Sequence, residues 1–120
     1  MYKFRKLQIW QRSMALVSQV YRITSIFPRR EIYGLIDQLR RAAVSIPLNI
    51  AEGCGCTTEI EFIRFLRISL RSLYELVTGF EIAMNLEYID TRSFQDIESM
   101  TNELGAMING LINKLKISKS

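Results

Sequence analysis

Apolar side chains recur at intervals of three and four residues along most of the 120-residue chain, and this period constrains the fold more than any other feature. The pattern is clearest after Thr58, where two adjoining lines of apolar or small residues share one predicted helix. The first line is Ile63, Leu66, Leu70, Leu73, Val77, Phe80 and Met84, and the second is Phe62, Phe65, Ser69, Ser72, Leu76, Gly79 and Ala83. A helix with two such lines has an apolar face wide enough to contact two neighbours. No strand-like alternation competes with the helical period.

Two prolines and six glycines interrupt this period and divide the chain into four predicted helices. The first helix is expected from about Phe4 to Ile26, and Pro28 prevents it from continuing. Its predicted apolar face is Leu7, Trp10, Met14, Val17 and Tyr21. The second helix is expected to end at Gly53-Cys54-Gly55. Its predicted apolar face is Ile32, Leu35, Ile36, Leu39, Ala42, Ala43, Ile46 and Ile50.

The starts of the last two helices have capping signals. Thr58 to Glu61 has the T-x-x-E pattern of a capping box, in which the threonine oxygen accepts a hydrogen bond from a free backbone N–H. Asp90 or Thr91 is expected to cap the fourth helix. The apolar line of that helix is Phe94, Ile97, Thr101, Leu104, Ile108, Leu111 and Leu115.

The connections between the four helices are short, which favours antiparallel neighbours. We therefore expect residues 1–120 to form one all-α domain, an antiparallel up-down-up-down four-helix bundle whose second helix is bent at Pro47. The alternative is a helical hairpin that completes its core only by oligomerising.

The residues that most enzymes need are missing. The chain has no histidine, which excludes Ser-His, Cys-His and histidine–metal sites within one chain. Cys54 and Cys56 form a lone C-x-C, which supplies too few thiolates for a closed zinc site. We expect both cysteines to be reduced residues in a turn. The alternative is that they supply a redox thiol or bind a metal shared between subunits. The prediction is a protein that is not an enzyme and has no metal or cofactor.

The termini and apolar runs indicate a cytoplasmic protein. The apolar runs are much shorter than the roughly 20 residues of a membrane-spanning helix. The N-terminal sequence MYKFRKLQIWQRS has no apolar segment followed by a cleavage site. We therefore expect neither export nor a membrane partner.

Positive charge is concentrated in the first part of the chain. The net charge is +4, but residues 1–71 carry +7 and residues 72–120 carry −3. Arg64, Arg67 and Arg71 lie at i, i+3 and i+7, so they form one stripe on the third helix. Together with Arg40 and Arg41 they are candidates for a surface that binds the phosphates of RNA or DNA without reading sequence.

A solvated surface is the alternative interpretation of the arginines. Asp37, Glu61 and Glu75 lie within helical reach of them and could neutralise part of the charge. Four aromatic residues are candidates for stacking on nucleic-acid bases, although aromatic residues at helical spacing more often belong to the core. These four are Tyr2, Phe4, Trp10 and Tyr33.

The segment from Gln38 to Gly53, QLRRAAVSIPLNIAEG, combines an apolar face with a polar one. The polar stripe is Arg41, Ser45, Asn49 and Glu52, spaced by four, four and three residues. Pro47 has no N–H and frees the Ala43 carbonyl, so a neighbouring side chain, a water or a second subunit is expected to satisfy that carbonyl.

This segment and the flanking sequences resemble a known family. IWQRSMALVSQVY, FPRREIYGLIDQLRRAAVSIPLNIAEGCG, EFIRFLRISLRSLYELVTGFEIAMNLEYI and ELGAMINGLINKL are similar to bacterial four-helix bundle proteins encoded in intervening sequences of 23S rRNA genes. Their relatives include the accessory variability proteins of diversity-generating retroelements. Those relatives form pentameric barrels with a basic surface and bind a reverse transcriptase and nucleic acid.

The resemblance implies a non-enzymatic, ring-forming accessory protein that is associated with nucleic acid. A homopentamer and a reverse transcriptase partner are expected on this ground alone. An interface or binding role is carried over to the residues at motif positions, which are Arg40, Arg41, Ser45, Pro47, Asn49, Glu52 and Gly53. Cys56 replaces a common Arg or Lys, and Leu48 replaces a usual Ser or Ala. The alternative function is a protein-interaction scaffold, with little nucleic-acid affinity of its own, that docks a partner such as a reverse transcriptase.

Overall fold

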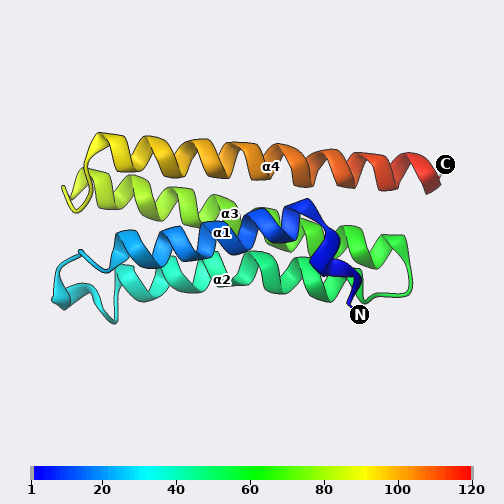
Figure 1. The fold of residues 1–120 in the computed structure, drawn as a ribbon, viewed down its shortest axis with the longest axis horizontal. Coiled ribbons are helices and arrows are strands. Elements are labelled where there is room, and N and C mark those ends of the chain that lie inside the picture. Colours follow the sequence, from blue (N-terminus) through cyan, green and yellow to red (C-terminus); the bar gives the residue numbers. More distant parts are fainter. Residues whose placement is uncertain (1, 120) are drawn as a thin grey trace.

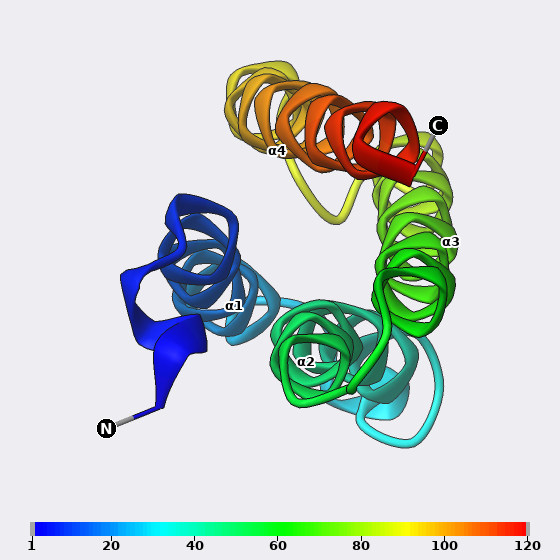
Figure 2. The same ribbon diagram turned by 90° about the vertical axis from the view of Figure 1, so that its right-hand side faces the viewer.

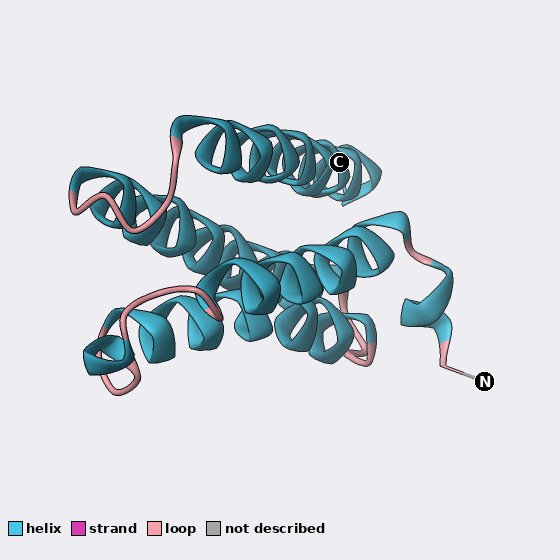
Figure 3. Ribbon diagram, turned by 60° about the vertical axis from the view of Figure 1, so that its left-hand side comes forward, coloured by secondary structure: helices cyan, strands magenta, loops and turns pink. Residues whose placement is uncertain are grey.

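The structure is a computed structural model that describes residues 2–119, with side chains for residues 2–117. This part of the chain contains four α-helices and two short 3-10 helices, joined by short loops (Figures 1 and 3). The α-helices are α1 (Gln8–Thr24), α2 (Leu35–Cys54), α3 (Glu59–Asn85) and α4 (Thr91–Lys119), and the 3-10 helices are η1 (Lys3–Lys6) and η2 (Arg29–Glu31). Successive α-helices run in opposite directions along a molecule of 48 × 23 × 20 Å. The predicted all-α four-helix bundle is confirmed.

The helices pack in the order in which they follow one another in the chain (Figure 2). The closest packing is between α2 and α3, and α3 also packs against α4. The prediction that the apolar face of α3 contacts two neighbouring helices is therefore confirmed. Both apolar lines of that face contribute buried residues, such as Leu66 and Leu76. Contacts between α1 and α4 close the bundle. Within residues 2–119, no helix combines the length and apolar character that crossing a bilayer requires.

For the first helix, the predicted start and the predicted buried face are both wrong. Leu7 is extended, with φ −77° and ψ 128°, and it separates η1 from α1. In the predicted apolar line, Met14 is 42% exposed and Tyr21 is 43% exposed. The line beside it is buried instead, and consists of Ile9, Ser13, Leu16, Val20 and Ile23.

The physical reason is that both lines of α1 have the same helical spacing, and the aliphatic one fills the core. Trp10 and Val17 of the predicted line lie half-buried at the edge of that core. Ser13 is tolerated in the interior because its hydroxyl donates to the Trp10 carbonyl at 2.7 Å.

The other predicted elements agree closely with the structure. The predicted apolar face of α2 is buried or half-buried apart from Ile32, which precedes the helix and is 46% exposed. α2 continues through Pro47 to Cys54, and the bend at Pro47 stays a prediction. Thr58 caps α3 by accepting the Glu61 N–H at 3.2 Å.

Asp90 is the residue that caps α4. Its Oδ1 accepts the Ser93 N–H at 2.7 Å. The predicted line of α4 is buried from Phe94 to Ile108, after which Ile112 is the buried residue and Leu111 and Leu115 are half-buried.

Glu31 connects the start of α2 to the loop between α3 and α4. Its Oε1 accepts the Leu35 N–H at 3.0 Å, and its Oε2 accepts the Tyr88 hydroxyl at 2.9 Å. The Tyr88 ring packs on Phe27 with 5.5 Å between the ring centroids. The pKa of Glu31 is lowered, first by the Leu35 hydrogen bond and then by the Tyr88 hydrogen bond.

Candidate nucleic-acid interface

The three arginines of α3 line an open groove that lies between α3 and the C-terminal part of α4. We call it the α3–α4 groove, and its volume is about 770 Å³. The start of α3 and the end of α4 lie at the same end of the molecule (Figure 1). The groove is lined by Ile60, Ile63, Arg64, Arg67, Leu70, Arg71, Tyr74 and Lys116. The arginine stripe expected from the helical spacing is therefore present, and it faces solvent.

The positive charge of this groove is not neutralised by ion pairs in the described part of the chain. The ion pairs among the described side chains are Arg12–Glu103 and Arg41–Asp37. The pairing considered for Glu61 and Glu75 with the α3 arginines does not occur there. The Arg64 guanidinium instead lies 4.7 Å from the centroid of the Phe65 ring, a cation–π contact that keeps its charge available.

Three residues of the α3–α4 groove, Ile60, Tyr74 and Lys116, were missed by the sequence analysis. Tyr74 follows Arg71 at i+3 and is 62% exposed, so an extension of the same helical spacing would have found it. Lys116 comes from α4, and its place beside α3 depends on the packing of two helices. No local signal in the sequence predicts that position.

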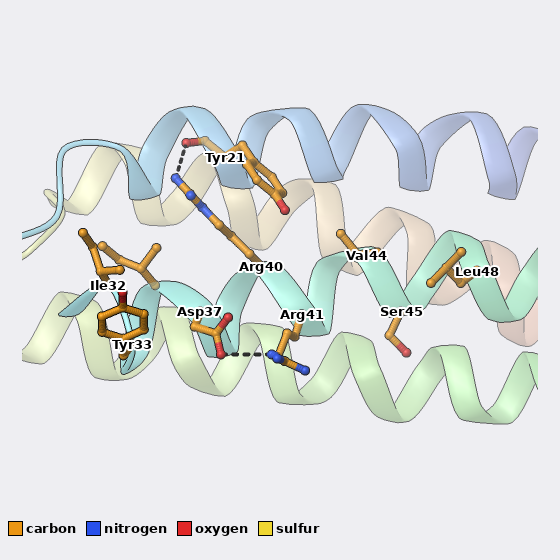
Figure 4. A pocket seen from close by; sticks show the side chains of 10 residues that line it. Tyr21, Ile32, Tyr33, Asp37, Arg40, Arg41, Val44, Ser45 and Leu48 are labelled. Carbon is orange, nitrogen blue, oxygen red and sulfur yellow. Dashed lines mark hydrogen bonds and ion pairs between the residues drawn. The ribbon is translucent and has the colours of Figure 1, made fainter. Parts of the chain in front are cut away.

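Arg40 and Arg41 lie in a different groove, between α1 and α2 (Figure 4). Arg40 Nε donates to Thr24 Oγ1 at 2.9 Å, and its guanidinium lies 4.4 Å from the centroid of the Tyr21 ring. Arg41 forms an ion pair with Asp37 at 2.9 Å. We call this the α1–α2 groove, and its volume is about 730 Å³. The structure thus places the five predicted arginines in two separate grooves.

One polar motif residue of α2, Ser45, contacts α3, and Asn49 bonds to Ser45. Ser45 Oγ is 2.8 Å from Ser72 Oγ, and Asn49 Nδ2 donates to the Ser45 carbonyl at 2.8 Å. Pro47 and Gly53 are buried, whereas Glu52 is exposed.

The packing of α2 on α3 also uses a backbone carbonyl next to Pro47. The buried Ser69 hydroxyl donates to the Ile46 carbonyl at 2.9 Å. Together with the Ser45–Ser72 contact, this hydrogen bond gives the motif a clear intramolecular role, which is to hold two helices together.

The other candidate residues are dispersed. Tyr2 stacks on Phe4 at 5.6 Å, and Phe4 packs on Trp10 at 5.1 Å, whereas Tyr33 is 96% exposed. Cys54 and Cys56 are free and half-buried. Within the described residues, no three His, Cys, Asp or Glu side chains gather as a metal site would require.

Comparison with known proteins identifies the family. The family model for 23S rRNA-intervening sequence proteins matches residues 5–110, and no curated protein sequence matches the chain. One similar crystal structure is that of a protein with unknown function from the S23 ribosomal protein family of Bacteroides thetaiotaomicron VPI-5482. Its TM-score is 0.81 and its identity 20%, over 88% of this chain and 95% of the other, so the two share a fold. Because the family model spans most of the sequence, this chain belongs to the family of 23S rRNA-intervening sequence proteins.

Proposed function

We propose that this protein is a non-enzymatic, homo-oligomeric accessory protein of the cytoplasm that binds RNA or DNA without sequence specificity. The observation that carries the proposal is the set of cations along one groove, which is Arg64, Arg67, Arg71 and Lys116. Their charge is not taken up by the ion pairs of the described side chains. Closely spaced cations on one surface attract a phosphate backbone, and binding releases the counterions of the nucleic acid.

The proposal is tested by fluorescence anisotropy of labelled structured RNA, single-stranded DNA and duplex DNA over a series of salt concentrations. We expect the affinity to fall as salt rises. In the variant Arg64→Ala/Arg67→Ala/Arg71→Ala, the slope of log affinity against log salt should decrease in size by about 2 for a single strand, because three phosphate contacts are lost.

A matched control separates the groove from net charge. Arg22, Arg29 and Arg30 are exposed and lie outside the α3–α4 groove, so replacing them by alanine removes the same charge elsewhere. This control variant should retain most of the affinity. Absence of binding at low salt, or an equal loss in both variants, would contradict the proposal.

The homo-oligomeric part of the proposal is supported by apolar side chains exposed around α1 and α2. Ile32, Tyr33 and Leu48 line the α1–α2 groove, and they are 46%, 96% and 57% exposed. Such residues in a cluster are typical of surfaces that bind another protein. The pentameric subunit number rests on the family resemblance.

The second candidate function is a scaffold that docks a protein partner such as a reverse transcriptase. The observation that favours it is the apolar side of the α3–α4 groove, where Ile60 is 67% exposed beside the arginines. Protein interfaces often combine an apolar centre with arginine anchors. Absence of nucleic-acid affinity, together with loss of partner binding in the triple arginine variant, would favour the scaffold.

A further inference from the structure

The α3–α4 groove has an apolar floor as well as a cationic rim, and the floor restricts what can bind there. We propose that the groove takes single-stranded nucleic acid, with a base stacked on the Tyr74 ring and phosphates held by the arginines and Lys116. This inference rests on the proposed function and names its substrate class. It is carried by the exposure of Tyr74, the composition of the floor and the position of the nearest carboxylates.

Tyr74 presents its ring to solvent at the edge of the groove. It lies one helical turn after Arg71 and is 62% exposed. Tyr74 lines the α3–α4 groove and also a smaller groove between α2 and α3, so the side chain lies between the two. A tyrosine in that position adds little to the core of the bundle.

The Tyr74 side chain is 62% exposed and is not paired with an aromatic ring or an arginine among the described side chains. Among the described side chains, Tyr2 has an arginine and a phenylalanine against its ring, and Tyr21 has the Arg40 guanidinium. Aromatic side chains beside a basic groove are the usual stacking platforms for unpaired bases.

The floor of the groove distinguishes a single strand from a duplex. Ile60, which is 67% exposed, offers apolar surface beside the cations, and the buried Ile63 and Leu70 also line the groove. A duplex turns its phosphates and sugars outward and keeps its bases paired, so this surface would stay in water. The unstacked bases of a single strand can cover it while the phosphates reach the rim.

Glu75, next to Tyr74, does not line the α3–α4 groove, and neither do Glu59 and Glu61, which flank Ile60 in the sequence. Glu75 instead lines the grooves between α2 and α3. Arg64 and Arg71 are seven residues apart, about 10 Å along the helix axis, so the cations extend over a path that suits a short strand. We therefore expect the strand to run from Tyr74 toward Arg64 and Lys116.

The test compares three labelled ligands at low salt: an oligothymidylate, a strand of the same length with abasic sugars, and the matched duplex. Tyr74→Leu should weaken binding of the oligothymidylate by between about fivefold and about 150-fold, the range that base–aromatic stacking contributes. Binding of the abasic strand and the duplex should not change. Tyr74→Phe, which keeps the ring, should bind like the unmodified protein.

The matched control is Tyr2→Leu, which changes another exposed tyrosine, 67% exposed and outside both grooves, and should leave all three affinities unchanged. Circular dichroism of each variant checks that the bundle is intact. If the oligothymidylate and the abasic strand bind equally and Tyr74→Leu has no effect, the inference is overturned. The proposed function then still stands, provided that the triple arginine variant loses affinity. If none of the three ligands binds at low salt, both fail.

Discussion

Gly53 and Gly79 allow α2 and α3 to pack closely. A Cβ atom on Gly53 would lie 2.8 Å from the Cβ of Phe65, and one on Gly79 would lie 2.4 Å from Leu39 Cδ2. Phe65 Cβ is attached to the backbone of α3, so it cannot move away without a shift of that helix. Gly53 therefore belongs to the packing of the bundle, whatever further role the surrounding motif has.

Gly53→Ala should destabilise the protein, and Gly110→Ala should stabilise it. Filling the contact with Phe65 forces the two helices apart, which costs about 1–3 kcal/mol of the free energy of unfolding. Gly110 is exposed on α4, and a Cβ atom added there would meet no neighbouring side chain within 4 Å, so alanine removes backbone entropy and gains about 0.5–1 kcal/mol. Chemical unfolding of both variants measures the two changes. A Gly53→Ala protein as stable as the unmodified one would contradict the packing argument.

At the scale of elements, Glu31 and Asp90 hold the two loops at the same end of the bundle. Asp90 caps α4, and its pKa is lowered chiefly by the hydrogen bond from the Ser93 N–H. Glu31 receives the Leu35 N–H and the Tyr88 hydroxyl, and its pKa is lowered as well. A carboxyl group with a lowered pKa stabilises the fold above its ordinary pKa, and this contribution is lost as the pH falls through the lowered value.

Glu31→Gln should reduce the acid sensitivity of the fold. The unmodified protein should lose stability as the pH falls below the ordinary glutamate pKa of about 4.3, because protonation weakens both hydrogen bonds to the carboxylate. The glutamine variant should be less stable at neutral pH, and the difference between the two proteins should shrink toward acid pH. Denaturant unfolding of both proteins across this pH range measures the difference between their free energies of unfolding. Asp90 contributes equally in both proteins. A difference independent of pH would contradict the assigned role of Glu31.

At the scale of the whole molecule, α3, α4 and the loop between them carry most of their positive charge at one end of the bundle and most of their negative charge toward the other. The α3–α4 groove lies at the end where α3 begins and α4 ends (Figure 1). Acidic residues gather toward the opposite end, in the second half of α3, the following loop and the first half of α4. They are Glu75, Glu81, Glu87, Asp90, Asp96, Glu98 and Glu103. We therefore expect a polyanion to approach the end that holds the groove.

The proposed homo-oligomer makes a prediction at the same scale. The mass in solution, measured by light scattering, should exceed the 14.0 kDa of one chain. Leu48→Glu places a charge in the α1–α2 groove and should shift the mass toward one chain without unfolding the bundle. Leu86→Glu, at a residue that is 51% exposed outside that groove, is the control and should leave the mass unchanged. A mass of one chain at all concentrations would contradict the homo-oligomer.

The sequence by itself determined the features that depend on neighbours along the chain. The helical period predicted four helices, Thr58 and the pair Asp90 or Thr91 predicted two helix starts, and the double apolar line predicted that α3 contacts two helices. The arginine stripe of α3 followed from spacing alone. These features are local because helix hydrogen bonds, caps and faces involve residues within about four positions of one another.

Tertiary structure decided what depends on residues far apart in the chain. It selected which of two equally spaced lines of α1 is buried, because the choice depends on the aliphatic surface that α2 and α4 offer. It separated Arg40 and Arg41 from the α3 arginines by directing them toward α1 and Asp37. It also brought Lys116 into the groove that the α3 arginines line, since packing between helices, rather than helical spacing, sets which side chains from different helices meet.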